Sequence, residues 1–267
     1  MPPLTLPPPD TIIDTDGCLA RIYTVLNSPP AEGCPKGGVV ILLHGNHGTG
    51  AVFAPLLPLL TGRPHRQCDT DIPVCVHYII PELPWHTTSP RWASFLDDPR
   101  TAAAYCLHIA DLLGIPRFDF VGHSLGGMIG LTLALDHPDR IASLALLDAH
   151  VKLGERPHAL NRLAPFDPSR HDHAEAIAQN MGGPAVNWHL AFDLSARART
   201  IRCPVLELIG ESTPDTADLF DAWRQEHRAD YPPTWRIQRI PRGGHFFPLE
   251  QPALTAAALH RFWGDNG

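Results

Sequence analysis

The fold is decided by residues 118–127, which read Phe-Asp-Phe-Val-Gly-His-Ser-Leu-Gly-Gly. An apolar segment typical of a strand runs into Gly-x-Ser-x-Gly, and an apolar segment typical of a helix follows. Glycine on either side of Ser124 permits a sharp turn that a Cβ atom would obstruct. Such a turn lifts the serine above the edge of a sheet, and the amides at the N-terminus of the next helix favour a negative oxygen nearby. The pattern therefore predicts a nucleophilic Ser124, with His123 turned into the protein body.

Apolar runs on both sides of this turn extend the pattern. Val39–Leu43 contains no polar residue, and Val74–Ile80 is a second run of the same kind. Such runs are typical of strands that are covered on both faces of a parallel sheet. Further strands are expected at 18–26, 118–121, 141–147, 204–209 and 235–240, and helices at 99–113, 125–137, 215–228 and 251–263. Strands that alternate with helices predict an α/β protein with a mostly parallel central sheet flanked by helices.

One connection is much longer than the others. About 55 residues separate the strand that ends at Leu147 from the one that starts near Pro204, whereas connecting loops in such folds usually have roughly 2–6 residues. A small helical cap inserted at residues 150–200 accounts for this length, and residues 1–149 and 201–267 then form the core. The apolar and aromatic residues of the cap suffice to cover a pocket, although packing of the cap on the core explains them equally well.

Composition limits the possible partners. The chain has 267 residues, 44% hydrophobic and 18% charged, as in an ordinary globular protein. Its 21 basic and 28 acidic residues give a net charge of −7 without a basic cluster, which argues against a nucleic-acid partner. No apolar run is long enough for a membrane span and the Pro-rich start does not resemble a secretory signal, so a cytoplasmic location is expected. The six scattered cysteines are expected to be free thiols, with Cys68 and Cys75 the pair most able to bridge.

A serine nucleophile needs a base and a site for the negative oxygen that forms when it attacks a carbonyl group. His245 lies in a Gly-Gly-His loop between the last predicted strand and the last predicted helix, where the base of a Ser–acid–His series belongs. The backbone N–H groups of Asn46 and Leu125 are expected to form an oxyanion hole. His47 and the other histidine of its loop are alternatively metal ligands, but no third ligand accompanies them at an ordered spacing, so neither a metal nor another cofactor is expected.

Three motifs together resemble those of the α/β-hydrolase superfamily. They are the His-Gly loop at 44–48, the Gly-His-Ser-Leu-Gly-Gly turn at 122–127 and the Gly-Gly-His-Phe-Phe-Pro loop at 243–248. The resemblance extends from about residue 18 to residue 263. It implies the α/β-hydrolase fold and a Ser–acid–His triad, but it does not specify the substrate.

The triad acid departs from the common pattern of this superfamily. Most relatives carry Gly-x-x-Asp after the strand that ends here at Ile209, and this chain reads Gly-Glu-Ser-Thr at 210–213. Asp148 ends the preceding strand, about 24 residues after Ser124. Zearalenone-type lactone hydrolases and cofactor-independent quinolone dioxygenases, which this chain resembles, carry the acid there. The resemblance therefore favours Asp148 as the acid, with Asp215 and Glu211 as alternatives.

These residues predict a serine hydrolase that cleaves a carboxylic ester or lactone, a small-molecule substrate held under the cap, through an acyl-enzyme on Ser124. His47, Trp85 and Trp188 are expected to line the substrate pocket. The alternative is a cofactor-independent ring-cleaving dioxygenase or C–C bond-cleaving enzyme, in which His245 and Asp148 act as the base and the serine only orients the substrate. A ligand receptor without catalytic activity is a second alternative.

Overall fold

A computed structural model describes ten parts of the chain. They are residues 6–15, 17–26, 38–46, 48–61, 74–84, 98–149, 192–211, 225, 229 and 231–265. Several predictions fall outside these residues and keep the status of predictions. They concern most of the cap (150–191), the pocket candidates His47, Trp85 and Trp188, the alternative acid Asp215, all but residue 225 of the helix at 215–228, and the pairing of Cys68 with Cys75, whose side chain is not described.

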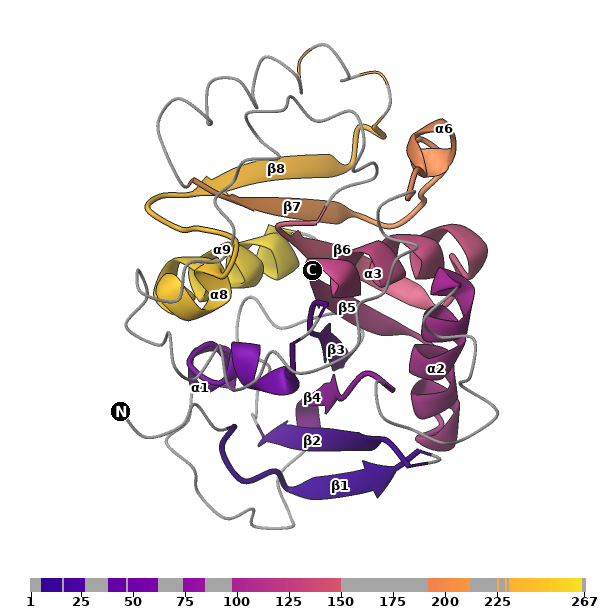
Figure 1. Cartoon of the computed structure of the whole chain (residues 1–267), viewed down its shortest axis with the longest axis vertical. Helices are drawn as coiled ribbons and strands as arrows, with labels where there is room; N and C mark the ends of the chain where they lie inside the picture. Colours follow the sequence, from indigo (N-terminus) through magenta and orange to yellow (C-terminus); the bar gives the residue numbers. More distant parts are fainter. Residues whose placement is uncertain are drawn as a thin grey trace.

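The centre of the molecule is a sheet of eight strands, in the spatial order β1-β2-β4-β3-β5-β6-β7-β8 (Figure 1). The strand pairs from β4 to β8 are parallel, and only the pairs β1–β2 and β2–β4 are antiparallel. The mostly parallel sheet predicted from the sequence is confirmed. The strands are β1 (Thr11–Asp14), β2 (Leu19–Leu26), β3 (Val39–Leu43), β4 (Val74–Pro81), β5 (Phe118–His123), β6 (Ile141–Leu147), β7 (Val205–Gly210) and β8 (Trp235–Ile240).

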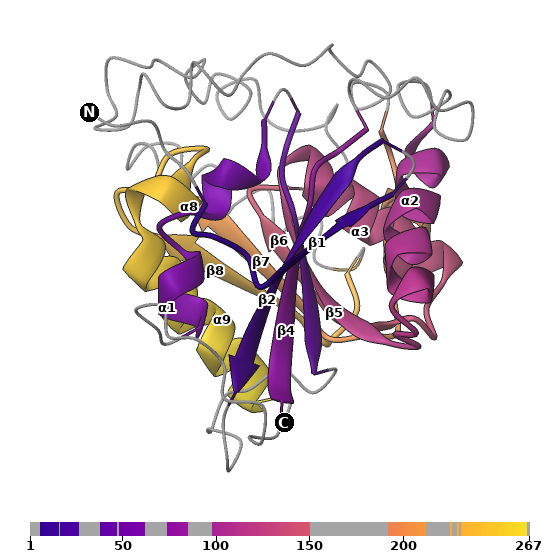
Figure 2. The same ribbon diagram turned by 90° about the horizontal axis from the view of Figure 1, so that it is seen from below.

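Helices cover both faces of this sheet, as Figure 2 shows with the sheet seen edge-on. Helices α2 and α3 lie on one face, and α1, α8 and α9 lie on the other. The helices are η1 (Gly50–Phe53), α1 (Leu57–Thr61), α2 (Pro99–Leu112), α3 (Leu125–Asp136), α6 (Ser195–Ala198), α8 (Phe247–Glu250) and α9 (Pro252–Asp265). None of the helices among the described residues is long and apolar enough to cross a membrane.

The two layers of helices produce two hydrophobic cores, one on each face of the sheet. All five residues of β3 are buried. Ile41 and Leu43 belong to the core under α2 and α3, whereas Val40 and Leu42 belong to the core under α1 and α9. Successive side chains of a strand point to opposite faces, so a strand covered on both sides must be apolar throughout. The uninterrupted apolar run in the sequence has this physical cause.

Local signals in the sequence begin and end α2. The carboxylate of Asp98 accepts a hydrogen bond from the backbone N–H of Arg100 at 2.8 Å and so caps the helix N-terminus. Pro99 occupies the first turn, where its missing N–H costs nothing. Gly114, with φ 65°, follows the last turn in the left-handed conformation that glycine adopts easily.

Short elements were not predicted. Strand β1 pairs with β2 from Thr11 to Asp14, although a four-residue strand is too short to give a recognisable alternation. The five-residue helix α1 and the four-residue helices α6 and α8 were missed for the same reason. Of the segment assigned to the cap, residues 192–200 are described, and Phe192 and Ala198 pack into the core under α2 and α3.

Candidate active site

Ser124 lies in the sharp turn between β5 and α3, with φ 52° and ψ −118°. Its backbone N–H donates to the carbonyl of Leu147 at 2.9 Å, which ties the turn to the end of β6. The turn closes tightly, because a Cβ atom on Gly122 would lie 2.4 Å from the backbone of Gly126. A Cβ atom on Gly126 would in turn lie 2.2 Å from the carbonyl oxygen of Leu43. Both glycines of the motif are therefore required by close backbone approach.

The parallel register brings the ends of β5 and β6 together. His123 pairs with Leu147, so the next residue of each strand, Ser124 and Asp148, leaves the same edge of the sheet. Asp148 has φ 50°, and its N–H donates to the carbonyl of Leu208 at 2.8 Å. Two residues that are far apart in the sequence thus become neighbours at the carboxyl edge, where open α/β sheets usually bind their ligands.

Asp148 contacts the imidazole of His245. Its Oδ2 lies 2.6 Å from Nδ1 of the ring, and its Oδ1 accepts the backbone N–H of Gly210 at 3.4 Å. The carboxylate side chain is only 2% exposed, whereas the histidine side chain is 37% exposed. A buried carboxylate on Nδ1 holds the proton on that nitrogen and leaves Nε2 as the basic atom of the ring.

The loop that carries His245 is held by several backbone contacts. It begins at Arg242 with φ 59°, and the N–H of Gly244 donates to the carboxylate of Glu250 in α8. A Cβ atom on Gly210 would lie 2.2 Å from the carbonyl of Gly244, so the loop lies directly against the end of β7. The loop therefore packs against β7, the strand next to β6. Asp148 directly follows β6.

His123 supports the same loop from below. It is 2% exposed, which confirms that it points into the protein body. Burial, and then the neighbouring His245, lower the pKa of His123 to about 3. Its Nε2 lies 2.8 Å from the backbone oxygen of His245. Because a carbonyl only accepts, Nε2 carries the proton of the neutral ring and donates to it.

No hydrogen bond joins the Ser124 hydroxyl to the His245 ring in the described part of the chain. The two residues nevertheless leave the same edge of the sheet, and the rings of His123 and His245 have centroids 4.9 Å apart. Bonds between nucleophile and base are often long without substrate and shorten when it binds. The structure thus presents the histidine–carboxylate contact, with the serine at the same edge of the sheet.

The predicted oxyanion residues belong to the N-terminus of α3 and to a loop that passes next to the serine turn. Leu125 begins α3, where the first N–H groups have no partner within the helix. Asn46 is half-buried in the loop after β3. The preceding Gly45 lies so close to the turn that a Cβ atom on it would be 2.9 Å from Cβ of Ser124. The loop and the helix N-terminus thus approach the serine from two sides.

Of the two alternative acids, the structure describes Glu211, and the side chain of Glu211 pairs with a residue other than His245. Its carboxylate pairs with the guanidinium of Arg239 in β8, with Oε1 and Nη1 3.3 Å apart. The carboxylate that reaches His245 is that of Asp148. Among the described residues, no group of three or more His, Cys, Asp or Glu side chains is arranged to hold a metal ion.

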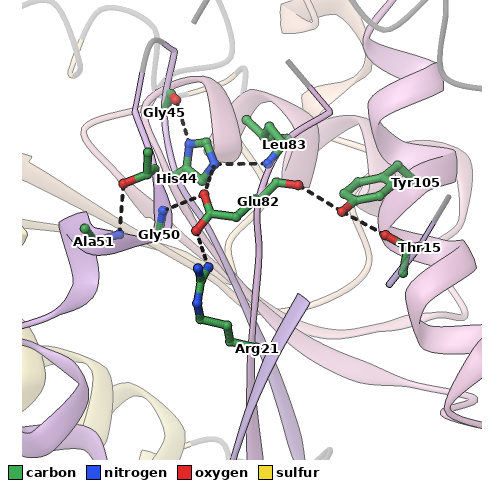
Figure 3. A network of polar contacts seen from close by, with 10 residues as sticks. Thr15, Arg21, His44, Gly45, Gly50, Ala51, Glu82, Leu83 and Tyr105 are labelled. Atoms are coloured by element: carbon green, nitrogen blue, oxygen red, sulfur yellow. Dashed lines mark hydrogen bonds and ion pairs between the residues drawn. The ribbon is translucent and has the colours of Figure 1, made fainter. Parts of the chain in front are cut away.

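A second polar cluster, which the sequence analysis missed, lies beside the Asn46 loop (Figure 3). It is centred on Glu82, which contacts Arg21 in β2 and the buried ring of His44. The available signal was a carboxylate directly after β4, at the same sheet edge as Asp148. It was missed because nothing in the local sequence shows which loops that edge brings together.

A cavity of about 530 Å³ lies at the other edge of the sheet and is separate from this site. It is lined by residues at or before the amino ends of β3, β5, β6 and β7, among them Arg117, Asp119 and Ser143. The carboxylate of Asp119 there accepts a hydrogen bond from the Ser143 hydroxyl.

Comparisons with known proteins agree with this fold. A putative carbamate hydrolase, RutD, of Variovorax paradoxus is 52% identical over 269 residues, covering 86% of this chain and 93% of that protein. A pimeloyl-(acyl-carrier protein) methyl ester esterase of Chromobacterium violaceum is 33% identical over 198 residues, covering 72% and 61%. The naproxen esterase structure of Bacillus subtilis superposes with a TM-score of 0.64 at 19% identity, covering 94% of this chain and 90% of that one. Residues 38–231 match the alpha/beta hydrolase fold family, and the chain therefore belongs to this family.

Proposed function

We propose that the protein is a serine hydrolase that cleaves a carboxylic ester or lactone through an acyl-enzyme on Ser124. One observation carries the proposal. Oδ2 of Asp148 lies 2.6 Å from Nδ1 of His245, at the sheet edge where the nucleophile turn ends. A histidine oriented in this way activates a serine hydroxyl, which is a weak nucleophile at its own pKa.

The proposed reaction has two halves. The Ser124 hydroxyl adds to the substrate carbonyl while Nε2 of His245 takes its proton, and the backbone N–H groups of Asn46 and Leu125 stabilise the negative oxygen. The leaving alcohol then departs with the proton from His245, and the acyl group stays on the serine. Water attacks the acyl-enzyme by the same route and releases the acid. Asp148 stays ionised throughout and stabilises the imidazolium.

The similar proteins support a reaction at a carbonyl carbon. One is named as a methyl ester esterase and another as a putative carbamate hydrolase. A carbamate has a carbonyl carbon that the same nucleophile can attack, so carbamates belong in the set of test substrates beside esters and lactones.

The decisive experiment compares the parent protein with Ser124→Ala on p-nitrophenyl esters, lactones, carbamates and hydroxyquinolones, with dissolved oxygen monitored. We expect hydrolysis by the parent and a loss of roughly 10⁴-fold or more in kcat for the variant, because the nucleophile is removed. Retained turnover with oxygen consumption would overturn the proposal in favour of the dioxygenase, in which the His245–Asp148 pair is the base. Failure of folded parent protein to turn over any substrate or to be labelled by a fluorophosphonate would indicate a binder.

The same assay tests the acid. Asp148→Asn is expected to lower kcat on the order of 10⁴-fold, because an amide favours the wrong imidazole tautomer. Glu211→Gln is the matched control and should retain activity, since Glu211 pairs with Arg239. Asp215→Asn should also retain activity. A large loss in either control, with Asp148→Asn active, would transfer the role of the acid.

A further inference from the structure

The carboxylate of Glu82 lies at the base of the loop that carries Asn46. It follows β4, and the loop runs from His44, after β3, to Gly50, where η1 begins. Oε2 accepts the backbone N–H of Gly50 at 3.1 Å and lies 3.4 Å from Nε2 of His44. The carboxylate therefore holds the Gly50 end of the loop by a hydrogen bond and lies beside the ring of His44 at the other end (Figure 3).

The ring of His44 links the residue after Glu82 to the middle of the loop. Its Nε2 accepts the backbone N–H of Leu83 at 3.1 Å, so the proton of the neutral ring is on Nδ1. That Nδ1 lies 3.0 Å from the carbonyl oxygen of Gly45 and donates to it. The same carbonyl accepts the N–H of Gly48 at 3.2 Å. The backbone on either side of Asn46 is thereby tied to residues 82 and 83.

Glu82 is itself held from two directions. The guanidinium of Arg21, in β2, donates to Oε1. The hydroxyl of Tyr105, in α2, donates to the backbone carbonyl of Glu82 at 2.9 Å and accepts from Thr15 at 3.2 Å. Burial raises the pKa of Glu82, but its polar and charged neighbours lower it more, so the net pKa lies below its usual value. The carboxylate is therefore ionised at neutral pH and fixed in place.

The loop needs such an anchor, because residues 44–46 and 48–49 belong to neither a helix nor a strand. Gly45 lies against Ser124, so a shift of the loop moves the Asn46 N–H relative to the reacting carbon. Oxyanion donors act only when they are already placed where the negative charge develops. A displaced donor reduces the stabilisation of the transition state more than it reduces the affinity for the substrate.

We propose that Glu82 is a positioning residue of this enzyme, whose carboxylate, oriented by Arg21, helps to hold residues 44–46 and 48–50 so that the N–H of Asn46 meets the developing oxyanion. The proposal rests on the function proposed above. It assigns to Glu82 no contact with the substrate and no proton transfer. Glu82 affects the reaction only through the position of the loop, so its loss should lower kcat rather than raise KM.

The test uses Glu82→Gln, which keeps the size of the side chain but removes its charge. The concentration of active sites is measured from the burst of p-nitrophenol. Misfolded protein then does not affect the kcat that is calculated. We expect kcat to fall roughly 10-fold to 100-fold, less than the loss of about 10²–10³-fold on removing an oxyanion donor outright, while KM changes less than threefold. The affinity of a trifluoromethyl ketone, to which the serine adds to form an oxyanion, should fall in parallel with kcat.

A control that removes the charge of another carboxylate–arginine pair is Asp111→Asn. The Asp111 side chain is 62% exposed, against 25% for Glu82, and its partner Arg140 is 26% exposed, against 27% for Arg21. The Asp111–Arg140 pair joins the end of α2 to the chain before β6, so kcat should not change. If Glu82→Gln does not fold, Arg21→Gln replaces it, because loss of the orienting cation should lower kcat and ketone affinity in the same direction by a smaller factor.

The outcomes separate this proposal from the one on which it rests. An active, fluorophosphonate-labelled parent together with unchanged kcat and ketone affinity per active site in Glu82→Gln overturns the positioning role, whatever happens to the melting temperature. The same result in Arg21→Gln overturns it if the first variant is unfolded. A parent that is neither labelled nor active overturns both proposals.

Discussion

Ser124 and Asp148 share an unusual backbone conformation, with φ values of 52° and 50°. Non-glycine residues with positive φ cost about 1–3 kcal/mol each, and they persist only where the surroundings hold them. The N–H of each residue donates to a neighbouring strand, that of Ser124 to Leu147 at 2.9 Å and that of Asp148 to Leu208 at 2.8 Å. Strain is therefore present at two of the three positions that form the proposed triad.

At the scale of single residues, His123 is a buried histidine that stays neutral. Its pKa of about 3 lies well below the value of roughly 6.5 expected for an unfolded chain. Between these two values the unfolded chain binds a proton that the folded protein does not bind. Folding stability is therefore lost as the pH falls from about 6.5 toward 3.

The variant His123→Gln tests this linkage, because glutamine keeps an N–H donor for the carbonyl of His245 but does not titrate. Urea unfolding at pH 7, 6, 5 and 4 measures the free energy of unfolding. The parent should lose up to about 1.4 kcal/mol per pH unit more than the variant in the acid range. Equal slopes for the two proteins would contradict a neutral buried His123.

At the scale of elements, α3 places glycine where a helix would ordinarily favour alanine. Gly126 approaches the carbonyl oxygen of Leu43 so closely that a Cβ atom would lie 2.2 Å from it. At Gly130, one turn later, a Cβ atom would meet the ring of Phe120 at 2.7 Å and a methyl group of Leu144 at 2.8 Å. Packing against β3 and β5, rather than helix propensity, accounts for these residues.

Gly126→Ala should destabilise the protein, although helix propensity alone predicts that this substitution stabilises it. In an exposed helix the change stabilises by about 1 kcal/mol, but here the new Cβ meets backbone that cannot rotate away. We expect a loss of about 3 kcal/mol or more in the free energy of unfolding, measured by urea denaturation. Gly130→Ala is the control and should cost less, because the side chains of Phe120 and Leu144 can move. A stabilised Gly126→Ala protein would refute the close approach of α3 to β3.

At the scale of the whole molecule, the sheet separates two cores that both depend on β3. Ile41 faces the core under α2 and α3, and Leu42 faces the core under α1 and α9. Both side chains are fully buried. The candidate active site lies at one edge of this sheet. The stability of the site therefore depends on both layers of helices.

Ile41→Ala and Leu42→Ala should therefore destabilise the protein to a similar extent, by roughly 2–5 kcal/mol each, because each leaves a cavity in a packed core. Thermal or urea unfolding measures the loss. Ile12→Ala, on the edge strand β1, is the control, because its side chain is 51% exposed and should change stability by less than about 0.5 kcal/mol. A loss confined to one of the two β3 variants would show that one face of the sheet is not packed.

Local pattern was sufficient for the longer strands, the long flanking helices α2, α3 and α9 and the serine turn, because apolar runs, helix-starting prolines and tightly spaced glycines act within a few residues of each other. The bounds of β3 and the start of α2 at Pro99 follow from such short-range signals. The sequence contains no comparable local signal for contacts between segments that are distant in the chain. The sequence left Asp148, Asp215 and Glu211 open as acids, and only the contact with His245 distinguishes Asp148 from Glu211.

Tertiary structure alone revealed the role that we propose for Glu82, since the residues around its carboxylate come from β2, from the loop after β3 and from η1. Which strands become neighbours, and which loops then meet at one sheet edge, depends on long-range packing that no local periodicity records. Side chains whose partners are close in sequence can thus be interpreted from the sequence, whereas those whose partners lie across the sheet require the folded protein.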